Sequence, residues 1–155
     1  MSRIYTAQFN GVAATVQQDL FEIVAGSAGI VLLHELCISQ LTEVADAAEE
    51  MLLVLLKSGS TTTGSGGSAP SKVARLFGDA ASGATVAANN TTKATAGTIV
   101  THHAWYWNVR VPFQMIWTPE TRPTLSPSRR GTVELATTPA DSITLGGYLV
   151  WEEIG

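Results

Sequence analysis

The sequence predicts an all-β protein: a single-domain β-sandwich or jelly-roll-like body of about seven strands, connected by long loops rich in Gly, Ser, Thr and Asn. Short runs of β-forming residues recur along the chain and are bounded by turn-forming residues. Between them lie long stretches of small, uncharged residues without helical periodicity. The chain has 155 residues, the usual size of one domain, so we expect residues 1–155 to share one core.

The N-terminal part of the chain predicts short strands. Residues 3–9 are rich in β-forming side chains and are followed by Asn10 and Gly11, a pair typical of tight turns between strands. Residues 19–24 are the second predicted strand. A short loop rich in Gly and Ala connects it to a third strand over 30–38.

Residues 42–57 fit two structures. Their apolar side chains recur at helical spacing, but the run 52–56 also fits a strand that is buried on both faces. We favour a loop over 39–48 and a strand over 49–57, because a Gly-Ser-Thr segment that suits a strand leaving a sheet follows at once.

An aromatic segment over 101–118 is the best candidate for a central strand. Trp105, Trp107, Val109 and Val111 alternate along it and therefore share one side. A proline then predicts a bend or bulge. Two final strands are expected over 131–138 and 142–154, joined by a turn.

Three long loops are predicted, over about 58–71, 79–101 and 118–130. Loops held by a rigid scaffold often carry binding residues, so we expect contacts with partners here. The arginines of the third loop form the one basic cluster; a phosphate site, a solvated loop and an ion pair with a neighbouring subunit are its alternative explanations. The candidate contact residues are Thr61, Thr62, Thr63, Ser65, Asn89, Asn90, Arg122, Arg129 and Arg130.

Composition restricts the class of function. Charged residues make up only 14 % of the chain, against about 25 % in typical proteins. A surface with so few charges tends to associate, which favours an oligomer or docking into a larger assembly. The net charge of −4 argues against a general nucleic-acid binder.

No catalytic motif is complete in the sequence. Residues 59–65 approach a phosphate-binding P-loop, but Ser65 stands where that motif requires Lys. His102 and His103 are adjacent, so on a strand they point to opposite faces and cannot easily bind one metal ion. We therefore expect no enzyme activity, no cofactor and no metal site.

The sequence also predicts where the protein is made. The N-terminus lacks the apolar segment of a secretory signal, and no stretch approaches the roughly 20 apolar residues of a membrane span. The single cysteine, Cys37, cannot form an internal disulfide. We expect synthesis in a reducing cytoplasm and no association with a membrane.

Several short blocks, scattered over most of the chain, together resemble a group of small virion-associated proteins of tailed bacteriophages. The blocks are residues 19–23 (DLFEI), 62–70 (TTGSGGSAP), 89–92 (NNTT), 107–110 (WNVR), 139–142 (PADS) and 152–153 (EE).

The resemblance implies a capsid cement or decoration protein that sits on the exterior of the virion, contacts the major capsid protein and bridges capsomers. Such proteins commonly occupy local threefold axes, so a homotrimer is the expected oligomer. Two alternatives stay open: another phage structural component of the tail, adaptor or fibre, and a carbohydrate-binding β-sandwich that stacks sugars on Trp105, Trp107 or Trp117.

Overall fold

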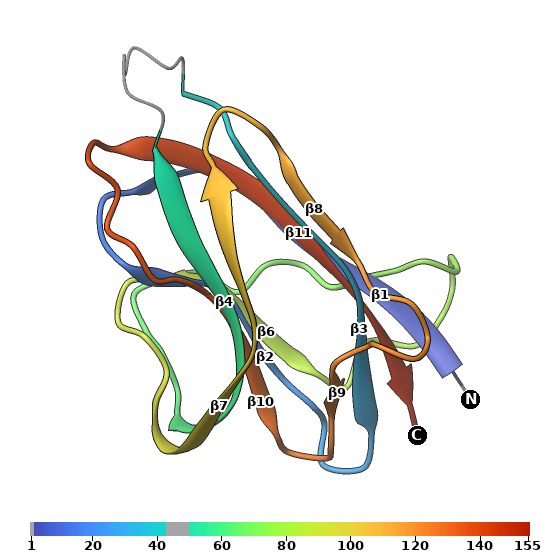
Figure 1. Cartoon of the computed structure of the whole chain (residues 1–155). Coiled ribbons are helices and arrows are strands. Elements are labelled where there is room, and N and C mark those ends of the chain that lie inside the picture. Colours follow the sequence, from blue (N-terminus) through green and yellow to red (C-terminus); the bar gives the residue numbers. More distant parts are fainter. Residues whose placement is uncertain (1, 43–49) are drawn as a thin grey trace.

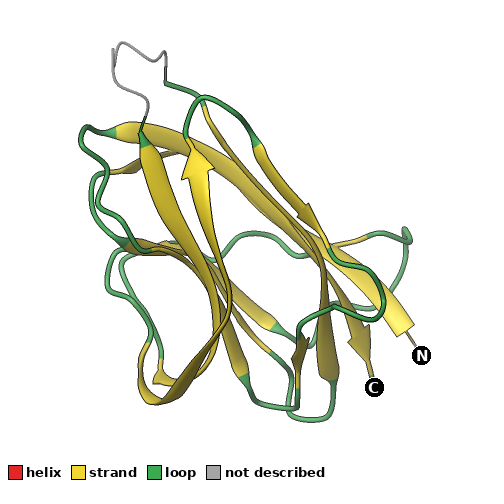
Figure 2. Ribbon diagram, in the orientation of Figure 1, coloured by secondary structure: helices red, strands yellow, loops and turns green. Residues whose placement is uncertain are grey.

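Two antiparallel β-sheets stacked face to face form the molecule, as the computed structural model of residues 2–42 and 50–155 shows (Figure 1). Figure 2 shows strands joined by loops, without a helix in the described part of the chain. The predicted β-sandwich is therefore confirmed. The described residues form eleven strands rather than about seven. The strands at 85–90 and 124–125 lie inside segments predicted as loops, the aromatic segment over 101–118 divides into two strands, and a two-residue strand lies at 73–74.

The first sheet joins the two ends of the chain. Its order is β5-β1-β11-β3-β8, with β9 also pairing with β3. Ser2 pairs with Ile154 at its end, so the termini lie side by side (Figure 1). The strands are β5 (Val73–Ala74), β1 (Ser2–Ala14), β11 (Ile143–Ile154), β3 (Ile30–Gln40), β8 (Phe113–Ile116) and β9 (Thr124–Leu125).

The second sheet has the order β6-β2-β10-β4-β7. Its central strand β10 pairs with β2 on one side and β4 on the other. The strands are β6 (Thr85–Asn90), β2 (Gln18–Val24), β10 (Arg130–Leu135), β4 (Met51–Thr62) and β7 (Thr95–Asn108).

Alternating apolar side chains of both sheets meet in one core. Phe9 of the first sheet lies against Phe21 of the second, with ring centroids 5.1 Å apart. Tyr5 stacks on Trp151 within the first sheet at 5.9 Å, and both are buried. A fully buried aromatic side chain of this kind contributes about 2–3 kcal/mol through the apolar area it removes from water.

The predicted turn at Asn10 and Gly11 is wrong. Strand β1 continues through these residues, and its register with β11 shifts between Phe9 and Val12. Gly11 has a φ of +68°, a conformation that glycine adopts without strain. The pair therefore forms a bulge within a long strand instead of ending a short one.

The strand alternative for residues 42–57 is confirmed from Met51 onward. Leu52, Val54 and Leu56 are buried, while the residues between them are partly exposed, so one face of β4 lies in the core. The predicted burial on both faces is wrong. The remainder of the ambiguous segment, residues 43–49, lies outside the described residues.

Two of the predicted loops contain long strands. Strand β4 continues to Thr62 and takes up the start of the 58–71 loop. Strands β6 and β7 occupy most of the 79–101 loop. Their residues are mainly Ala, Thr, Gly and Asn, which carry little intrinsic strand preference, so pairing with β2 and β4 overrides local propensity. The third loop, 118–130, is correct except for the two-residue strand β9 and for Arg130, which starts β10.

The aromatic segment is an edge strand, not a central one. Strand β7 ends at Asn108 and pairs with β4 alone among the described strands. Trp107 and Val109 are buried, but Val111 lies beyond the strand and is 59 % exposed. The four residues predicted to share one side therefore do not form one face.

Candidate functional site

The Gly-Ser-Thr segment, residues 61–68, begins with the last two residues of β4 and then lies against the outer face and edge of the second sheet. Ser65 and Thr92 form one isolated bridge, and Ser68 and Ala88 form another, so residues 65–68 extend the sheet beside β6. Both bridges carry paired backbone hydrogen bonds of 2.8 to 3.0 Å. The segment is thus bound to the sheet along its length.

Close approach requires glycine at this segment. A Cβ on Gly67 would lie 2.1 Å from the carbonyl oxygen of Ala88 and 2.6 Å from the Asn90 side chain. A Cβ on Gly66 would lie 2.3 Å from the hydroxyl oxygen of Thr91, and its φ is +87°. Glycines in a sequence that looks like a flexible linker here permit tight packing of backbone on backbone.

A buried ion pair between the second sheet and the Gly-Ser-Thr segment holds the segment in place. Arg130 Nε lies 2.7 Å from Oε1 of Glu22, and only 10 % of the Arg130 side chain and 2 % of the Glu22 side chain are exposed. The guanidinium of Arg130 also donates to the Ser60 carbonyl at 3.0 Å and to the Thr63 hydroxyl at 2.7 Å. The other oxygen of Glu22 accepts hydrogen bonds from the Gly64 amide and the Asn90 side chain, both at 2.9 Å.

Two further buried carboxylates lie on the same sheet. Glu134 pairs with Lys57 and with Lys93, whose Nζ is 2.8 Å away. Burial pushes the pKa of Glu134 upward, but the hydrogen bonds from both lysines outweigh it and leave that pKa below its usual value. Asp19 accepts a hydrogen bond from the Ala94 amide at 2.7 Å. It forms no salt bridge with the described residues, and burial raises its pKa to about 6 although the charge of Lys57 acts in the opposite direction.

The structure brings six of the predicted contact residues to this region. Thr61, Thr62, Thr63 and Ser65 are exposed on it. Asn90 and Arg130 lie beneath it and hold it in place. The signal that sequence reasoning missed is the acidic pair on β2, Asp19 and Glu22, two carboxylates on a short strand with four large apolar side chains.

The remaining predicted contact residues lie elsewhere or are buried. Asn89 is 5 % exposed, has a φ of +58° and accepts a hydrogen bond from Gln18 at 3.0 Å, so it has a structural role within β6. Arg122 lies on the first sheet, where its guanidinium is 3.1 Å from Glu152 and 2.9 Å from Nε2 of His34. Arg129 is exposed in the turn before β10. The three arginines therefore do not form one basic patch.

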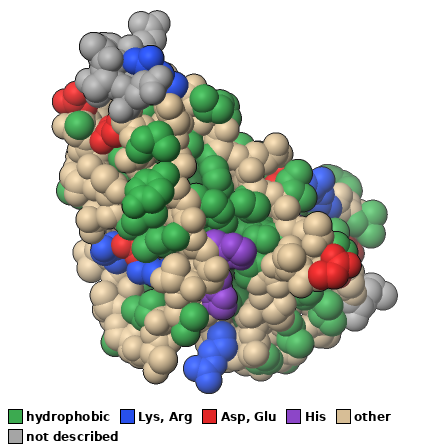
Figure 3. Space-filling view, viewed as in Figure 1, with side chains coloured by type: hydrophobic (Ala, Val, Ile, Leu, Met, Phe, Trp, Pro, Cys, Tyr) green, Lys and Arg blue, Asp and Glu red, His purple; other side chains and the backbone are tan. Residues whose placement is uncertain are grey.

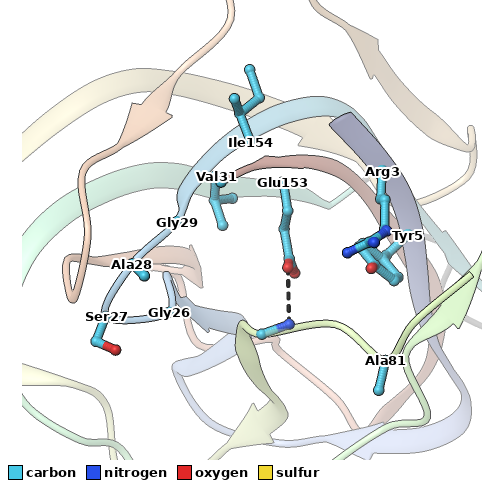
Figure 4. Close-up of a pocket in the computed structure, with 12 residues that line it drawn as sticks. Arg3, Tyr5, Gly26, Ser27, Ala28, Gly29, Val31, Ala81, Glu153 and Ile154 are labelled. Atoms are coloured by element: carbon cyan, nitrogen blue, oxygen red, sulfur yellow. Dashed lines mark hydrogen bonds between the residues drawn. The ribbon is translucent and has the colours of Figure 1, made fainter. Parts of the chain in front are cut away.

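A pocket of about 330 Å³ opens at the end of the sandwich where the chain termini lie (Figure 4). Arg3 and Tyr5 lie on one side of it, the loop with Ser27 and Ala28 lies on the other, and Glu153 projects between them (Figure 4). Glu153 accepts hydrogen bonds from the Gly83 amide at 2.9 Å, the Ala84 amide at 3.2 Å and the Trp151 indole at 2.9 Å.

These hydrogen bonds determine the ionisation of Glu153 and therefore the chemistry that is open to the pocket. Burial raises the pKa of Glu153, but its hydrogen bonds outweigh that effect and lower the pKa overall. Arg3 faces Asp79 at 3.7 Å. The carboxylate and the guanidinium are thus engaged within the protein, and Glu153 is the one acidic side chain among the described residues that line the pocket, whereas an acid-base pair requires two. In residues 2–42 and 50–155, no group of His, Cys, Asp and Glu is arranged to hold a metal ion.

The tryptophans lie in or against the core. Trp107 is 3 % exposed and Trp117 is 5 % exposed. Trp105 is half-buried between His103, whose ring stacks on it at 5.2 Å, and Phe113 at 5.4 Å. These rings close the side of the sandwich between β7 and β8, so their faces are not available for stacking on a sugar.

Comparison of the chain with protein-family models, with curated proteins and with solved structures found no match. Within the described residues, no helix is long and apolar enough to cross a membrane.

Proposed function

We propose that this chain is a structural virion protein of a tailed bacteriophage, a capsid cement or decoration subunit that stabilises the head shell by bridging capsomers. It is synthesised in the host cytoplasm and binds the major capsid protein on the exterior of the shell as a homo-oligomer, with a trimer as the expected form. The proposal assigns the protein no catalytic reaction.

The observation that carries the proposal is the fastened Gly-Ser-Thr segment. It presents the exposed hydroxyl groups of Thr61 and Thr62, the last residues of β4, whose backbone is held by the pairing of β4 with β7. Residues 63–68 continue from them and are held by Arg130 of the Glu22–Arg130 ion pair and by the bridges to β6. A segment that is ordered before binding loses little conformational entropy when it meets a partner. Its lack of charge also removes the desolvation cost of buried ions at a contact.

The physical requirements of a cement protein agree with this arrangement. Such a protein needs a rigid body and a surface that tolerates close neighbours. Each contact with a capsomer can be weak, because many copies bind the same shell and an oligomer binds several capsomers at once. The sugar-binding alternative is disfavoured by the burial of Trp107 and Trp117.

The test is cosedimentation of the purified protein with shells assembled from the major capsid protein of the same phage. We expect saturable binding by the wild-type chain and at least a tenfold weaker affinity for Thr61→Lys combined with Thr62→Lys, because two desolvated charges cost about 1.4 kcal/mol or more. Ser142→Lys, at an exposed position outside this segment, is the matched control. Absence of binding to shells, or binding to tails alone, would overturn the capsid assignment.

A further inference from the structure

The sheet edges of the molecule differ in how they are protected. In the first sheet, β5 has two residues, β8 has four, and the edge of β1 beyond β5 is interrupted by the bulge at Gly11. In the second sheet, β6 is covered by the bridges from Ser65 and Ser68. Short strands, bulges and covering segments are the usual devices that prevent an edge from pairing with another chain.

Strand β7 differs from these edges in length and in charge, although its register with β4 shifts at His102 and again between Gly97 and Val100. It has 14 residues, and among the described residues its backbone pairs with β4 alone. It contains no Lys, Arg, Asp or Glu between Thr95 and Asn108. A long edge strand without charged side chains is a template for an added strand. At about 3.3 Å per residue, β7 offers an edge roughly 46 Å long.

Exposed apolar side chains gather around the same edge. Figure 3 looks onto the side where β7 and β8 are seen in Figure 1, and it shows hydrophobic side chains gathered around histidine side chains. Tyr106 on β7 is 72 % exposed. The other large apolar side chains of β7, β4 and the β7–β8 segment that are exposed are Met51, Ile99, Val100, Val111 and Ile116.

We infer that the free edge of β7 binds the β7 edge of a second copy of this chain, antiparallel and around a twofold axis. Pairing of identical neutral edges brings no like charges together, although each molecule carries a net charge of −4. The second sheets of two copies then form one continuous sheet, and the unpaired amide and carbonyl groups of both edges become hydrogen-bonded.

The register with β4 specifies how two copies fit. Thr101 lies opposite Lys57 and Ala104 lies opposite Leu55, so Thr101 and Ala104 share the outer face of the sheet. They do so although they are three residues apart, because the register shifts by a residue between these pairs, at His102.

A twofold axis between His102 and His103 therefore matches the faces of the two strands. It places Thr101 of one copy opposite Ala104 of the other. By the same spacing, Ile99 lies opposite Tyr106 on the outer face and Val100 lies opposite Trp105 on the inner face. Large apolar side chains thus meet across the axis, which favours a second copy over an unrelated strand as the occupant.

This inference does not depend on the proposed function. A twofold contact gives a dimer by itself, and it joins two trimers into a hexamer when a threefold contact exists elsewhere on the surface. Both the dimer and the hexamer contain an even number of copies. Shell binding and self-association are measured separately, so either proposal can fail without the other.

The first test is the mass of the purified chain by light scattering over a range of concentrations. We expect an even-numbered oligomer, and we expect Thr101→Lys combined with Tyr106→Lys to raise its dissociation constant at least tenfold, because the lysines of both copies meet at the paired edge. Both positions are exposed, so the fold is retained, which an unchanged melting temperature verifies. Val73→Lys, at a position 62 % exposed on β5, is the control and keeps the wild-type mass.

The second test fixes the register by disulfide formation in a Cys37→Ala background. Thr101→Cys and Ala104→Cys proteins are mixed and oxidised, and we expect a mixed disulfide dimer, since directly opposite residues have Cα atoms about 4.5–5.5 Å apart. Thr101→Cys mixed with Val73→Cys is the matched control. Light scattering would overturn the inference if the wild-type chain were a monomer, or a closed trimer whose mass the lysine pair leaves unchanged. Crosslinking no greater than in the control would also overturn it.

If the chain is monomeric in solution and the lysine pair abolishes its binding to shells, the partner of β7 is the capsid protein and not a second copy.

Discussion

Among the buried carboxylates that the structure describes on the second sheet, Asp19 is the one without a salt bridge. Its side chain is 1 % exposed, one of its oxygens has no hydrogen-bond partner, and its pKa is raised to about 6. In the unfolded chain the pKa is close to 3.9. Between these two values the side chain ionises in the unfolded state but keeps its proton in the folded state, so the contribution of Asp19 to stability falls as the pH rises from about 4 to 6.

The substitution Asp19→Asn should remove the loss of stability that the ionisation of Asp19 causes at higher pH. We expect the variant to match the wild type near pH 4 and to exceed it at pH 7.5 by an amount of the order of 1–3 kcal/mol, because the amide oxygen still accepts the hydrogen bond of Ala94 and no charge is buried. Urea unfolding at both pH values measures the difference. Asp141→Asn, at an exposed position, is the control. A wild-type chain more stable at pH 7.5 than the variant would contradict the assignment of Asp19 as a buried, unpaired charge.

Gly67 shows that a linker-like composition can serve tight packing. Gly67→Ala places a methyl group 2.1 Å from a backbone oxygen, so the segment must move away from β6. We expect a loss of about 1–3 kcal/mol in the free energy of unfolding. Gly29→Ala is the matched control, since its Cβ would meet no atom nearer than 3.7 Å. Equal stability of the two variants would show that residues 65–68 are not bound to the sheet.

The position of the Gly-Ser-Thr segment on the second sheet depends on the contacts of Arg130. Arg130→Ala leaves Glu22 buried without its cation and removes the bonds to Ser60 and Thr63. Breaking a buried ion pair on one side costs about 3–5 kcal/mol. We expect that loss in urea unfolding, together with faster amide hydrogen exchange at Gly64 and Ser65.

Arg129 supplies the comparison, because it precedes Arg130 in the chain and is exposed. Arg129→Ala should change stability by less than about 0.5 kcal/mol, as surface substitutions usually do. If the two arginine variants were equally stable, or if exchange at Gly64 were unchanged by Arg130→Ala, the ion pair would not hold the segment.

Strand prediction succeeded where apolar alternation is strong and failed where small residues predominate. The sequence pattern of residues 19–24 and 30–38 marks β2 and β3 closely, because their apolar side chains fill the core. Strand β6 carries Ala and Asn at buried positions, since the Gly-Ser-Thr segment and the Glu22 carboxylate lie against them. Such positions become recognisable only once the tertiary contacts exist.

The bulges explain another part of what the sequence did not reveal. At Gly11 in β1 and at His102 in β7, an extra residue shifts the alternation, so a simple period of two loses its phase. Only part of the candidate site was predicted from the sequence. Thr61 to Ser65 were recognised from their composition. Glu22 and Arg130 are far apart in the chain and meet only through the pairing of β2 with β10, which the sequence does not reveal.

The whole molecule combines a core of two sheets with surfaces that differ in what they can contact. One face of the second sheet carries a polar segment fixed by buried charges. The edge of the same sheet at β7 is long and uncharged. We propose that the first surface contacts shell subunits and the second a copy of the chain, which allows a small protein to connect several neighbours.

Cryo-electron microscopy of phage shells incubated with a saturating amount of the protein tests this account most directly. It predicts added density on the outside of the shell, with residues 61–65 against capsomers and paired β7 edges wherever two copies meet at a twofold axis. Bare shells at saturating protein concentration, or bound copies that face the shell with the pocket end while residues 61–65 point to solvent, would contradict it.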